Sequence, residues 1–285
     1  MFYIYLAGEG HGAVALVNGF LYETNLLPSL IVITNDKKLI EICKNNTIKT
    51  KKTIPFKNLR SEDIVITSGY NKIINNNYIK KAEFFNIHYS LLPKYRGMHT
   101  LVWAIINGEK EVGYTIHKAT DIVDGGPIYS QKSIKVGSFN SWELMLQLDN
   151  LVQNNIAKFL KLYLSGSINP QDQNEDDVIC VAKRNKEDCK VNWKDWDSNL
   201  FPRYMQALVP PYPRPYFIYK EKTYYLLDLK IRSIKYHEIN GHVVHICNKY
   251  VGVKISDGIA YFEYFLLDGK KIKSNQVIKK TGIRL

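Results

Sequence analysis

The chain has 285 residues, of which 45% are hydrophobic and 23% are charged, which is typical of a folded globular protein and excludes intrinsic disorder. Its formal net charge of +12 favours anionic partners, such as nucleic acid, acidic membrane surfaces or nucleotide phosphates, without selecting among them. The four cysteines lack metal-ligand spacing, so we expect neither a zinc site nor a disulfide framework. No stretch has membrane-spanning length and the N-terminus lacks signal-peptide features, so we predict a cytoplasmic protein.

Short apolar segments alternate with helical patterns in the first half of the chain. This alternation is typical of an α/β fold in which crossover helices join the strands of a mainly parallel sheet. We predict strands at Phe2–Ala7, Leu30–Thr34, Ile64–Thr67, Phe84–His88, Gly113–His117 and Ile128–Ser133, and helices at about Ala13–Tyr22, Lys37–Lys44 and Thr100–Asn107.

The clearest predicted helix is Ser141–Leu164. Asn140 precedes it as an N-cap, Glu143 completes a capping box, and Gly166 provides a stop signal. One apolar stripe follows helical spacings of three and four, which indicates a helix packed along a core. The stripe consists of Met145, Leu148, Val152, Ile156, Phe159 and Tyr163.

The second half of the chain has a different sequence pattern. The polar, acidic segment Pro170–Asp177 predicts a linker, so we place the domain boundary between residues 1–177 and 178–285. After a short helix at Ser198–Leu208, turn signals separate short strands, which predicts a small β-rich barrel or sandwich. The predicted strands are Tyr216–Tyr219, Thr223–Leu229, His242–Cys247, Gly252–Ile255 and Ile259–Leu267.

Two polar side chains end a predicted strand. Asn86 and His88 flank Ile87, and the two-residue period of a strand places both on one face. Ligands of open α/β sheets bind at this end of the strands. The Asn86 amide can hold a developing oxyanion, and His88 titrates near neutrality and can move a proton. The same pair could instead bind loop backbone, and its spacing alone does not separate the two interpretations.

Asp124 is a third candidate because Gly125 and Gly126 follow it, and glycines let backbone approach a ligand closely. It could orient His88 or hold a proton near a reacting nitrogen. The same three residues also form an ordinary turn signal, so the segment by itself leaves both interpretations open.

Taken together, these segments resemble the formyltransferase family that uses 10-formyl-tetrahydrofolate. The family pattern N-x-H-x-S-L-L-P-x-x-R-G stands at Asn86–Gly97, G-x-T-x-H at Gly113–His117, and D-x-G at Asp124–Gly126 with the family spacing. The resemblance continues through Asp63–Ile74 and through the segment from Asn192 to Pro213. It therefore covers nearly the whole chain, which makes it much more specific than a single short motif.

The resemblance implies a Rossmann-like catalytic domain and a C-terminal OB-like barrel. It also implies catalytic roles for Asn86, His88 and Asp124, a supporting role for His117, 10-formyl-tetrahydrofolate as co-substrate, and no metal. Folate contacts are expected from Gly69, Tyr70, Ser90, Leu91, Asp121 and Ile122. Substrate contacts are expected from His11, Lys72, Lys94, Arg96, Arg203 and Tyr212.

The resemblance leaves several candidates for the molecule that accepts the formyl group. Arg96–Ala104 and Ser68–Lys72 look most like the sugar-nucleotide N-formyltransferases, which implies a dTDP-linked 3- or 4-amino-deoxyhexose, a homodimer and a role in O-antigen or other surface-glycan synthesis. Methionyl-tRNA formyltransferase is the alternative, although Thr34–Pro55 lacks the basic insertion loop often present there. Glycinamide ribonucleotide formyltransferase shares the Thr115–His117 version of the motif but is usually a single domain, so we place this acceptor last. A non-catalytic nucleic-acid-binding protein is the non-enzymatic alternative, which the intact Asn/His/Asp set disfavours.

Overall fold

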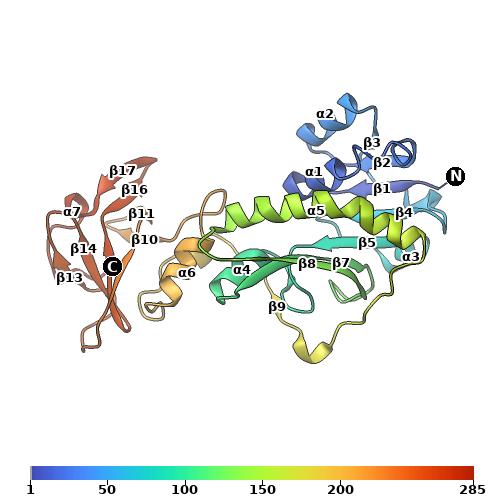
Figure 1. Ribbon diagram of the computed structural model, residues 1–285. Coiled ribbons are helices and arrows are strands. Elements are labelled where there is room, and N and C mark those ends of the chain that lie inside the picture. The colour runs from blue at the N-terminus through green and yellow to red at the C-terminus, as the bar shows by residue number, and fades with distance from the viewer. Residues whose placement is uncertain (1) are drawn as a thin grey trace. The chain divides into compact units, whose positions relative to one another are not determined.

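A computed structural model describes residues 2–285, which divide into two compact units (Figure 1). The first contains the described residues up to Leu101, together with Lys110–Lys135 and Leu144–Ala182. The second contains Lys183–Leu285 and two segments from earlier in the chain, Val102–Glu109 and Val136–Glu143. The second unit thus includes residues that a single cut in the sequence assigns to the first.

A seven-stranded sheet organises the first unit, in the order β3-β2-β1-β4-β5-β7-β8. The pairs from β3 to β5 are parallel, whereas β7 is antiparallel to both β5 and β8. The mainly parallel α/β sheet predicted from the sequence is therefore confirmed. Its strands are β1 (Ile4–Ala7), β2 (Leu30–Ile33), β3 (Lys49–Lys51), β4 (Ile64–Thr67), β5 (Glu83–His88), β7 (Glu111–Lys118) and β8 (Ile128–Lys135).

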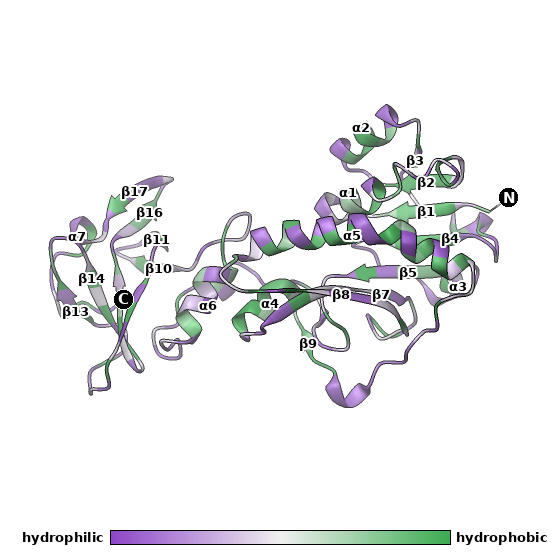
Figure 2. Ribbon diagram, viewed as in Figure 1, coloured by the Kyte–Doolittle hydropathy of each residue, from purple (hydrophilic) through white to green (hydrophobic). Residues whose placement is uncertain are grey.

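Both faces of this sheet are covered, which is why its central strands are apolar throughout. In β1, Ile4 and Leu6 point into the core beneath the helices, while Tyr5 and Ala7 enter a second core on the opposite face. Figure 2 shows β1 and β2 hydrophobic along their length, whereas α5 alternates between polar and apolar residues. The helices of this half of the chain are α1 (Gly10–Asn18), α2 (Lys37–Asn45), α3 (Asn76–Ile79), α4 (Thr100–Ile106) and α5 (Ser141–Leu164).

Helix α1 differs from its prediction at both ends. It begins at Gly10, since the glycines are tolerated in its first turn, and it ends at Asn18 instead of continuing to Tyr22. Gly19 lies so close to the Ile156 side chain of α5 that a Cβ would overlap it. The chain turns there because α5 occupies the space, a tertiary contact that the local pattern does not contain.

Helix α5 follows its prediction. Asn140 Oδ1 accepts hydrogen bonds from the backbone N–H groups of Trp142 and Glu143, both at 3.0 Å. Glu143 in turn accepts from the Asn140 N–H at 2.8 Å, which completes the predicted capping box. The predicted stripe is buried against the sheet, except that Tyr163 is only partly buried.

The segment predicted as a linker is instead fastened to the first unit. Gln171 forms a backbone bridge with Ile128, and Gln173 and Glu175 bind the guanidinium of Arg96. These polar side chains are held because they satisfy a buried arginine. Just beyond, β9 (Cys180–Val181) pairs with β6 (Arg96–Gly97). Single 3₁₀ turns occur at Leu27–Ser29, Phe56–Asn58, Glu175–Asp177 and Glu187–Cys189.

The second unit is β-rich, as predicted, with two four-stranded antiparallel sheets around one core. The order in one is β10-β11-β16-β17 and in the other β12-β15-β14-β13. Its elements are α6 (Leu200–Ala207), β10 (Tyr216–Tyr219), β11 (Lys222–Leu226), β12 (Lys230–Ser233), β13 (Val243–Ile246), β14 (Val251–Ile255), β15 (Gly258–Phe262), β16 (Tyr264–Leu267), β17 (Lys270–Lys273) and α7 (Ser274–Val277).

The last long predicted strand, Ile259–Leu267, is two strands in different sheets. The chain bends at Glu263, where the Asp228 carboxylate accepts the N–H of Glu263 at 2.6 Å and that of Tyr264 at 2.9 Å. At this bend the Asp228 carboxylate thus accepts the two backbone N–H groups, in place of the carbonyl groups of a neighbouring strand. No helix among residues 2–285 combines the length and apolarity needed to cross a membrane.

Candidate active site

The predicted catalytic residues meet at the carboxyl end of β5. Antiparallel pairing with β7 places His117 opposite Asn86 and Thr115 opposite His88. The turn after β7 then brings Asp124 back, so that its Oδ1 lies 3.4 Å from the amide nitrogen of Asn86. Four side chains from three segments of the chain therefore form one cluster: the three catalytic candidates and His117, which the sequence analysis gave a supporting role.

His88 is buried and held in one tautomer. Its Nε2 lies 2.8 Å from the carbonyl oxygen of Tyr95, which can only accept, so Nε2 carries the hydrogen in the neutral ring. Its Nδ1 faces Asp124 Oδ1 at 3.5 Å. Burial lowers the pKa of His88 below its ordinary value, and the nearby Asp124 charge and the Tyr95 carbonyl only partly oppose this. At neutral pH the ring is therefore a neutral base whose Nδ1 lone pair is directed into the cluster.

Asn86 is oriented from both sides. Thr67 of the neighbouring strand donates from Oγ1 to Asn86 Oδ1 at 2.8 Å, which fixes the amide nitrogen on the opposite side. That nitrogen lies 3.2 Å from His117 Nε2. Because His117 Nδ1 donates to the Lys118 carbonyl at 3.0 Å, its Nε2 accepts from Asn86. The Asn86 amide thus presents N–H donors to the centre of the cluster.

Asp124 occupies a backbone conformation that few residues other than glycine adopt, with φ of 54°. The N–H of Gly97 donates to its Oδ2 at 2.9 Å, and Gln173 holds its carbonyl oxygen at 2.7 Å. Burial alone would raise the pKa of Asp124, but contacts with His117, His88 and the Gly97 N–H outweigh it and lower that pKa. Asp124 is therefore a carboxylate at neutral pH.

The sequence predicted that the glycines after Asp124 let backbone approach a ligand, whereas the structure shows Gly126 packed against the backbone of the chain itself. A Cβ on Gly126 would overlap the carbonyl oxygen of Lys118, so no other residue fits there without a shift of the chain. The Gln173 amide also donates to the Gly126 carbonyl at 2.8 Å. Gln173 therefore fixes the turn that carries Asp124 at two points.

The loop after β5 is fastened by the strand beside it. Thr115 donates from Oγ1 to the Ser90 carbonyl at 2.7 Å and accepts the Leu92 N–H at 3.1 Å. Gln131 of β8 adds a hydrogen bond from its side-chain amide to the Leu92 carbonyl at 2.7 Å. The threonine two residues before His117 therefore anchors the loop that supplies the Tyr95 carbonyl.

The residues expected to contact folate lie in three loops. Ser90 and Leu91 belong to the anchored loop, and the Ser90 hydroxyl donates to the Lys94 carbonyl at 2.9 Å. Asp121 and Ile122 lie in the turn before Asp124, where Ile122 has 54% of its surface exposed. Gly69 and Tyr70 follow β4 and line a small pocket that Lys72 also lines.

Among the predicted substrate residues, His11 and Arg96 have well-defined polar partners within the chain. His11 Nδ1 lies 2.9 Å from the Asp149 carboxylate on α5, which also accepts the hydroxyl of Tyr89 at 2.5 Å. Arg96 has only 6% of its surface exposed, and its guanidinium binds Gln173 and Glu175. A phosphate would have to replace these partners to reach Arg96.

The other predicted substrate residues are placed differently. Lys72 and Lys94 are exposed in the first unit. Arg203, on α6, and Tyr212 belong to the second unit, where the Arg203 guanidinium lies against Gly108. The structure therefore brings together the three catalytic candidates, whereas the six substrate candidates are spread over both units.

Two residues that the sequence did not select hold predicted site residues in position. Thr67 orients Asn86, and Asp149 joins Tyr89 to His11. The one available signal for Asp149 was its position, a polar residue directly after Leu148 in the apolar stripe of α5. Thr67 carried no signal, since a threonine at the end of an apolar strand is common.

Comparison with known protein families places both halves of the chain. Residues 42–148 match the model of the formyl transferase family, and residues 183–281 match the model of the formyl transferase C-terminal domain. A methionyl-tRNA formyltransferase of Dictyoglomus thermophilum is 30% identical over 245 residues, which cover 83% of this chain and 78% of that protein. The chain belongs to the formyltransferase family of enzymes.

Two further similarities differ in extent. The bifunctional polymyxin resistance protein ArnA of Wigglesworthia glossinidia brevipalpis is 33% identical over 198 residues, but the match spans only 29% of that longer protein. The crystal structure of WlaRD, described as a sugar 3N-formyl transferase with dTDP and 5-N-formyl-THF, superposes with a TM-score of 0.72 at 21% identity. The match covers 92% of this chain and 97% of WlaRD, and at this identity it establishes a common fold.

Proposed function

We propose that this chain transfers a formyl group from 10-formyl-tetrahydrofolate to the amine of a nucleotide-linked amino sugar. The observation that carries the proposal is the pairing of a neutral His88, whose Nδ1 faces the cluster, with the Asn86 amide donors beside it. An amine that attacks a formyl carbon must lose a proton and create a transient oxyanion. These two groups have the chemistry for both tasks.

His88 would accept the proton of the attacking amine. Its Nε2–H is committed to the Tyr95 carbonyl, so Nδ1 is the basic atom. After protonation, the imidazolium would lie 3.5 Å from the Asp124 carboxylate, which stabilises the positive charge. Because burial keeps the ring neutral beforehand, the base is ready at physiological pH.

Asn86 would stabilise the oxyanion. Its amide nitrogen now contacts His117 and Asp124 at 3.2 and 3.4 Å, which are long bonds that a charged oxygen can displace. Asp124, a carboxylate before the reaction, would receive the amine proton from His88 across their 3.5 Å contact and pass it to the departing folate nitrogen. 10-Formyl-tetrahydrofolate supplies the formyl carbon, and the exposed Ile122 and Val123 beside Asp124 offer an apolar surface to its ring. Much of the rate would come from holding both substrates in attack geometry.

The sugar acceptor is supported by the fold shared with WlaRD over 92% of the chain. The alternative acceptor, methionyl-tRNA, is supported by the sequence, since the Dictyoglomus relative carries that name. The choice between them does not alter the proposed roles of Asn86, His88 and Asp124. The homodimer, the cytoplasmic location and the role in O-antigen synthesis remain predictions.

A formyl-transfer assay tests the proposal directly. The chain is incubated with 10-formyl-tetrahydrofolate and either dTDP-linked 3- and 4-amino-dideoxyhexoses or methionyl initiator tRNA. We expect turnover of a sugar nucleotide, loss of that turnover in His88→Ala, and its retention in His245→Ala, which removes an exposed histidine of the second unit. Turnover of the tRNA alone would transfer the proposal to the alternative acceptor. Turnover of neither set would contradict the proposed acceptors.

A further inference from the structure

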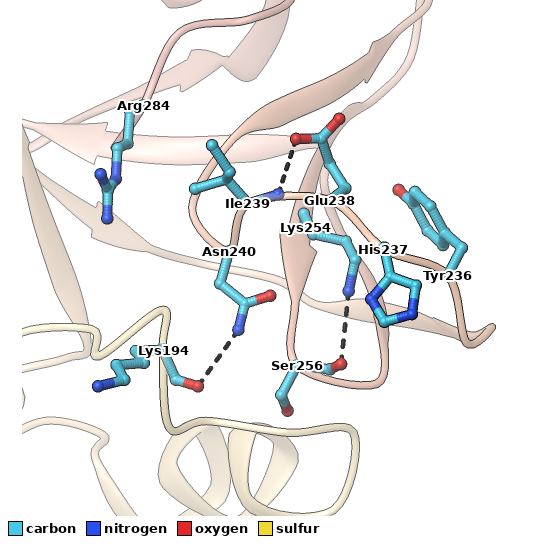
Figure 3. A pocket seen from close by; sticks show the side chains of 9 residues that line it. All are labelled: Lys194, Tyr236, His237, Glu238, Ile239, Asn240, Lys254, Ser256 and Arg284. Atoms are coloured by element: carbon cyan, nitrogen blue, oxygen red, sulfur yellow. Dashed lines mark hydrogen bonds between the residues drawn. The ribbon is translucent and has the colours of Figure 1, made fainter.

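A polar cavity of about 360 Å³ lies within the second unit, and none of its residues belongs to the candidate active site (Figure 3). Its volume falls in the range of roughly 300–1,000 Å³ typical of small-molecule sites. The lining residues come from the β12–β13 loop, the end of β14, the segment before α6 and the C-terminus. They are Lys194, Tyr236, His237, Glu238, Ile239, Asn240, Lys254, Ser256 and Arg284.

The charge of this cavity is strongly positive. Lys194, Lys254 and Arg284 contribute three cations, and Glu238 is the one carboxylate among the lining residues. The Glu238 carboxylate is already engaged, because it accepts the Ile239 N–H at 2.7 Å (Figure 3). It also contacts His242 at 3.2 Å. Its charge also acts on Lys254 from beyond ion-pair distance, so Glu238 offsets one of the three cations and an excess of two positive charges remains among these residues.

Lys254 is the most informative of these residues. It has only 1% of its surface exposed, yet within residues 2–285 it forms no ion pair. Its ammonium donates to the carbonyl oxygens of Ile255 and Ser256 and lies 5.0 Å from the centroid of the Tyr236 ring. An ammonium has three N–H donors, and the two carbonyl oxygens account for two of them. A buried charge is costly without a close counter-ion, and Glu238 acts on Lys254 only from beyond ion-pair distance, so an anion in this cavity would supply the closer one.

The cavity is also held in shape before any ligand arrives. The C-terminal segment that carries Arg284 is fastened by the Leu285 N–H to the Gly241 carbonyl at 3.0 Å. Gly241 donates in turn to the Lys254 carbonyl at 2.8 Å, and Asn240 donates to the Lys194 carbonyl at 3.3 Å. Three segments far apart in sequence thus line one space and are joined by hydrogen bonds, and a pre-formed site loses little entropy on binding.

We infer that this cavity binds the diphosphate group of a small molecule. Cations on several sides suit a group whose oxygens point in several directions, whereas a single carboxylate presents two oxygens in one plane. Lys194 and Arg284 would contact the outer oxygens, and the remaining N–H of Lys254 would contact the deepest one. Free pyrophosphate and a nucleoside diphosphate share this chemistry. The inference does not depend on the proposed function, since binding is measured without formyl transfer.

The test is binding of inorganic pyrophosphate to the full chain, measured by calorimetry at low ionic strength. We expect Lys194→Gln combined with Arg284→Gln to weaken binding at least about tenfold, because charged hydrogen bonds are lost. The matched control, Lys222→Gln with Lys270→Gln, removes the same charge from the other sheet and should stay within about twofold of the parent. Equal weakening in both variants, or no binding by the parent, would overturn the inference.

Hydrogen exchange locates the ligand. We expect pyrophosphate to slow exchange at the amides of Gly241 and Leu285, and this protection to be absent in the cavity variant. Thymidine diphosphate is the second probe: equal affinity identifies the diphosphate alone as the recognised group, and higher affinity adds the nucleoside. Lys254→Met, checked for folding by circular dichroism, should lose the protection as well. An oligonucleotide that protects these amides where pyrophosphate does not would assign the surface to nucleic acid and refute the inference.

Discussion

His88 Nδ1 and Asp124 Oδ1 face each other at 3.5 Å with no hydrogen atom between them in the neutral state, because the ring hydrogen lies on the opposite nitrogen, at the Tyr95 carbonyl. Two acceptors this close leave a place for one proton. In the proposed reaction this is the place that would take the proton released by the attacking amine. The proposed function assigns different roles to these two neighbours, His88 as the base and Asp124 as the charge that would stabilise its protonated form.

The substitution His88→Gln should abolish most activity while the protein stays folded. A glutamine side chain is polar and similar in size to histidine, but it cannot accept a proton near neutrality. We expect kcat to fall by about 10²- to 10⁴-fold, the usual contribution of a general base. Steady-state formyl transfer gives the rate, and thermal unfolding of the variant verifies the fold. A loss of less than tenfold would assign the proton transfer to another group.

The pH dependence follows from the lowered pKa of His88. Because the base must be neutral, kcat/KM should be constant around pH 7–8 and fall on the acid side, at a pH below the ordinary histidine value of about 6.5. The same shift acts on stability. The unfolded chain takes up the proton more readily, so this contribution is fully present above about pH 6.5 and is lost as pH falls through the folded pKa.

Asp124→Asn should change the pH dependence of activity through its effect on the pKa of His88. The Asp124 charge raises the pKa of His88, so its removal should move the acid limb of kcat/KM to lower pH and also reduce the maximal rate. A pH–rate profile of both proteins measures this. Movement of the limb to higher pH would contradict the assignment of His88 as the titrating base.

Thr67 should act through Asn86. Thr67→Val removes the hydroxyl that holds Asn86 Oδ1, so the amide is free to rotate and its donor is directed at the site less often. We expect a loss of about 1 kcal/mol in the free energy of unfolding and a fall in kcat of about tenfold with little change in KM. Thr67→Ser retains the hydroxyl and should restore kcat. A KM effect without a kcat effect would argue against this role.

Gln173 should be required for the Asp124 turn. Gln173→Leu leaves the carbonyl oxygens of Asp124 and Gly126 without their 2.7 and 2.8 Å donors. We expect a loss of about 1–3 kcal/mol in the free energy of unfolding, measured by urea titration, together with reduced kcat. The exposed neighbour Asp172→Asn is the control and should change neither quantity. Unchanged activity in Gln173→Leu would mean that the turn holds its position without this contact.

Several features could be predicted from the sequence because they are encoded within a few neighbouring residues. The two-residue period placed Asn86 and His88 on one strand, and the 3.6-residue period with its capping box defined α5. Runs of β-branched residues predicted the buried strands β2 and β4. The spacing of the two motif segments identified the formyltransferase family from the sequence alone.

The edge strands β3 and β17 could not be predicted from local sequence patterns. β3 and β17 are rich in lysine and largely exposed, so nothing in their composition separates them from loop. They are strands only because a partner, β2 or β16, offers unpaired backbone groups along its length. The bend between β15 and β16 could not be predicted from local sequence for the same reason, since the Asp228 carboxylate that stabilises it comes from another part of the chain.

Local periodicity and contiguous motifs were enough to predict the fold class, the principal helix and three residues of the site. The tautomer of His88, the orientation of Asn86 by Thr67 and the burial of Arg96 could be known only from the folded chain. Each of these depends on a partner that is distant along the chain or on a turn of the backbone. Such contacts exist only once the sheet, its loops and their packing have formed together.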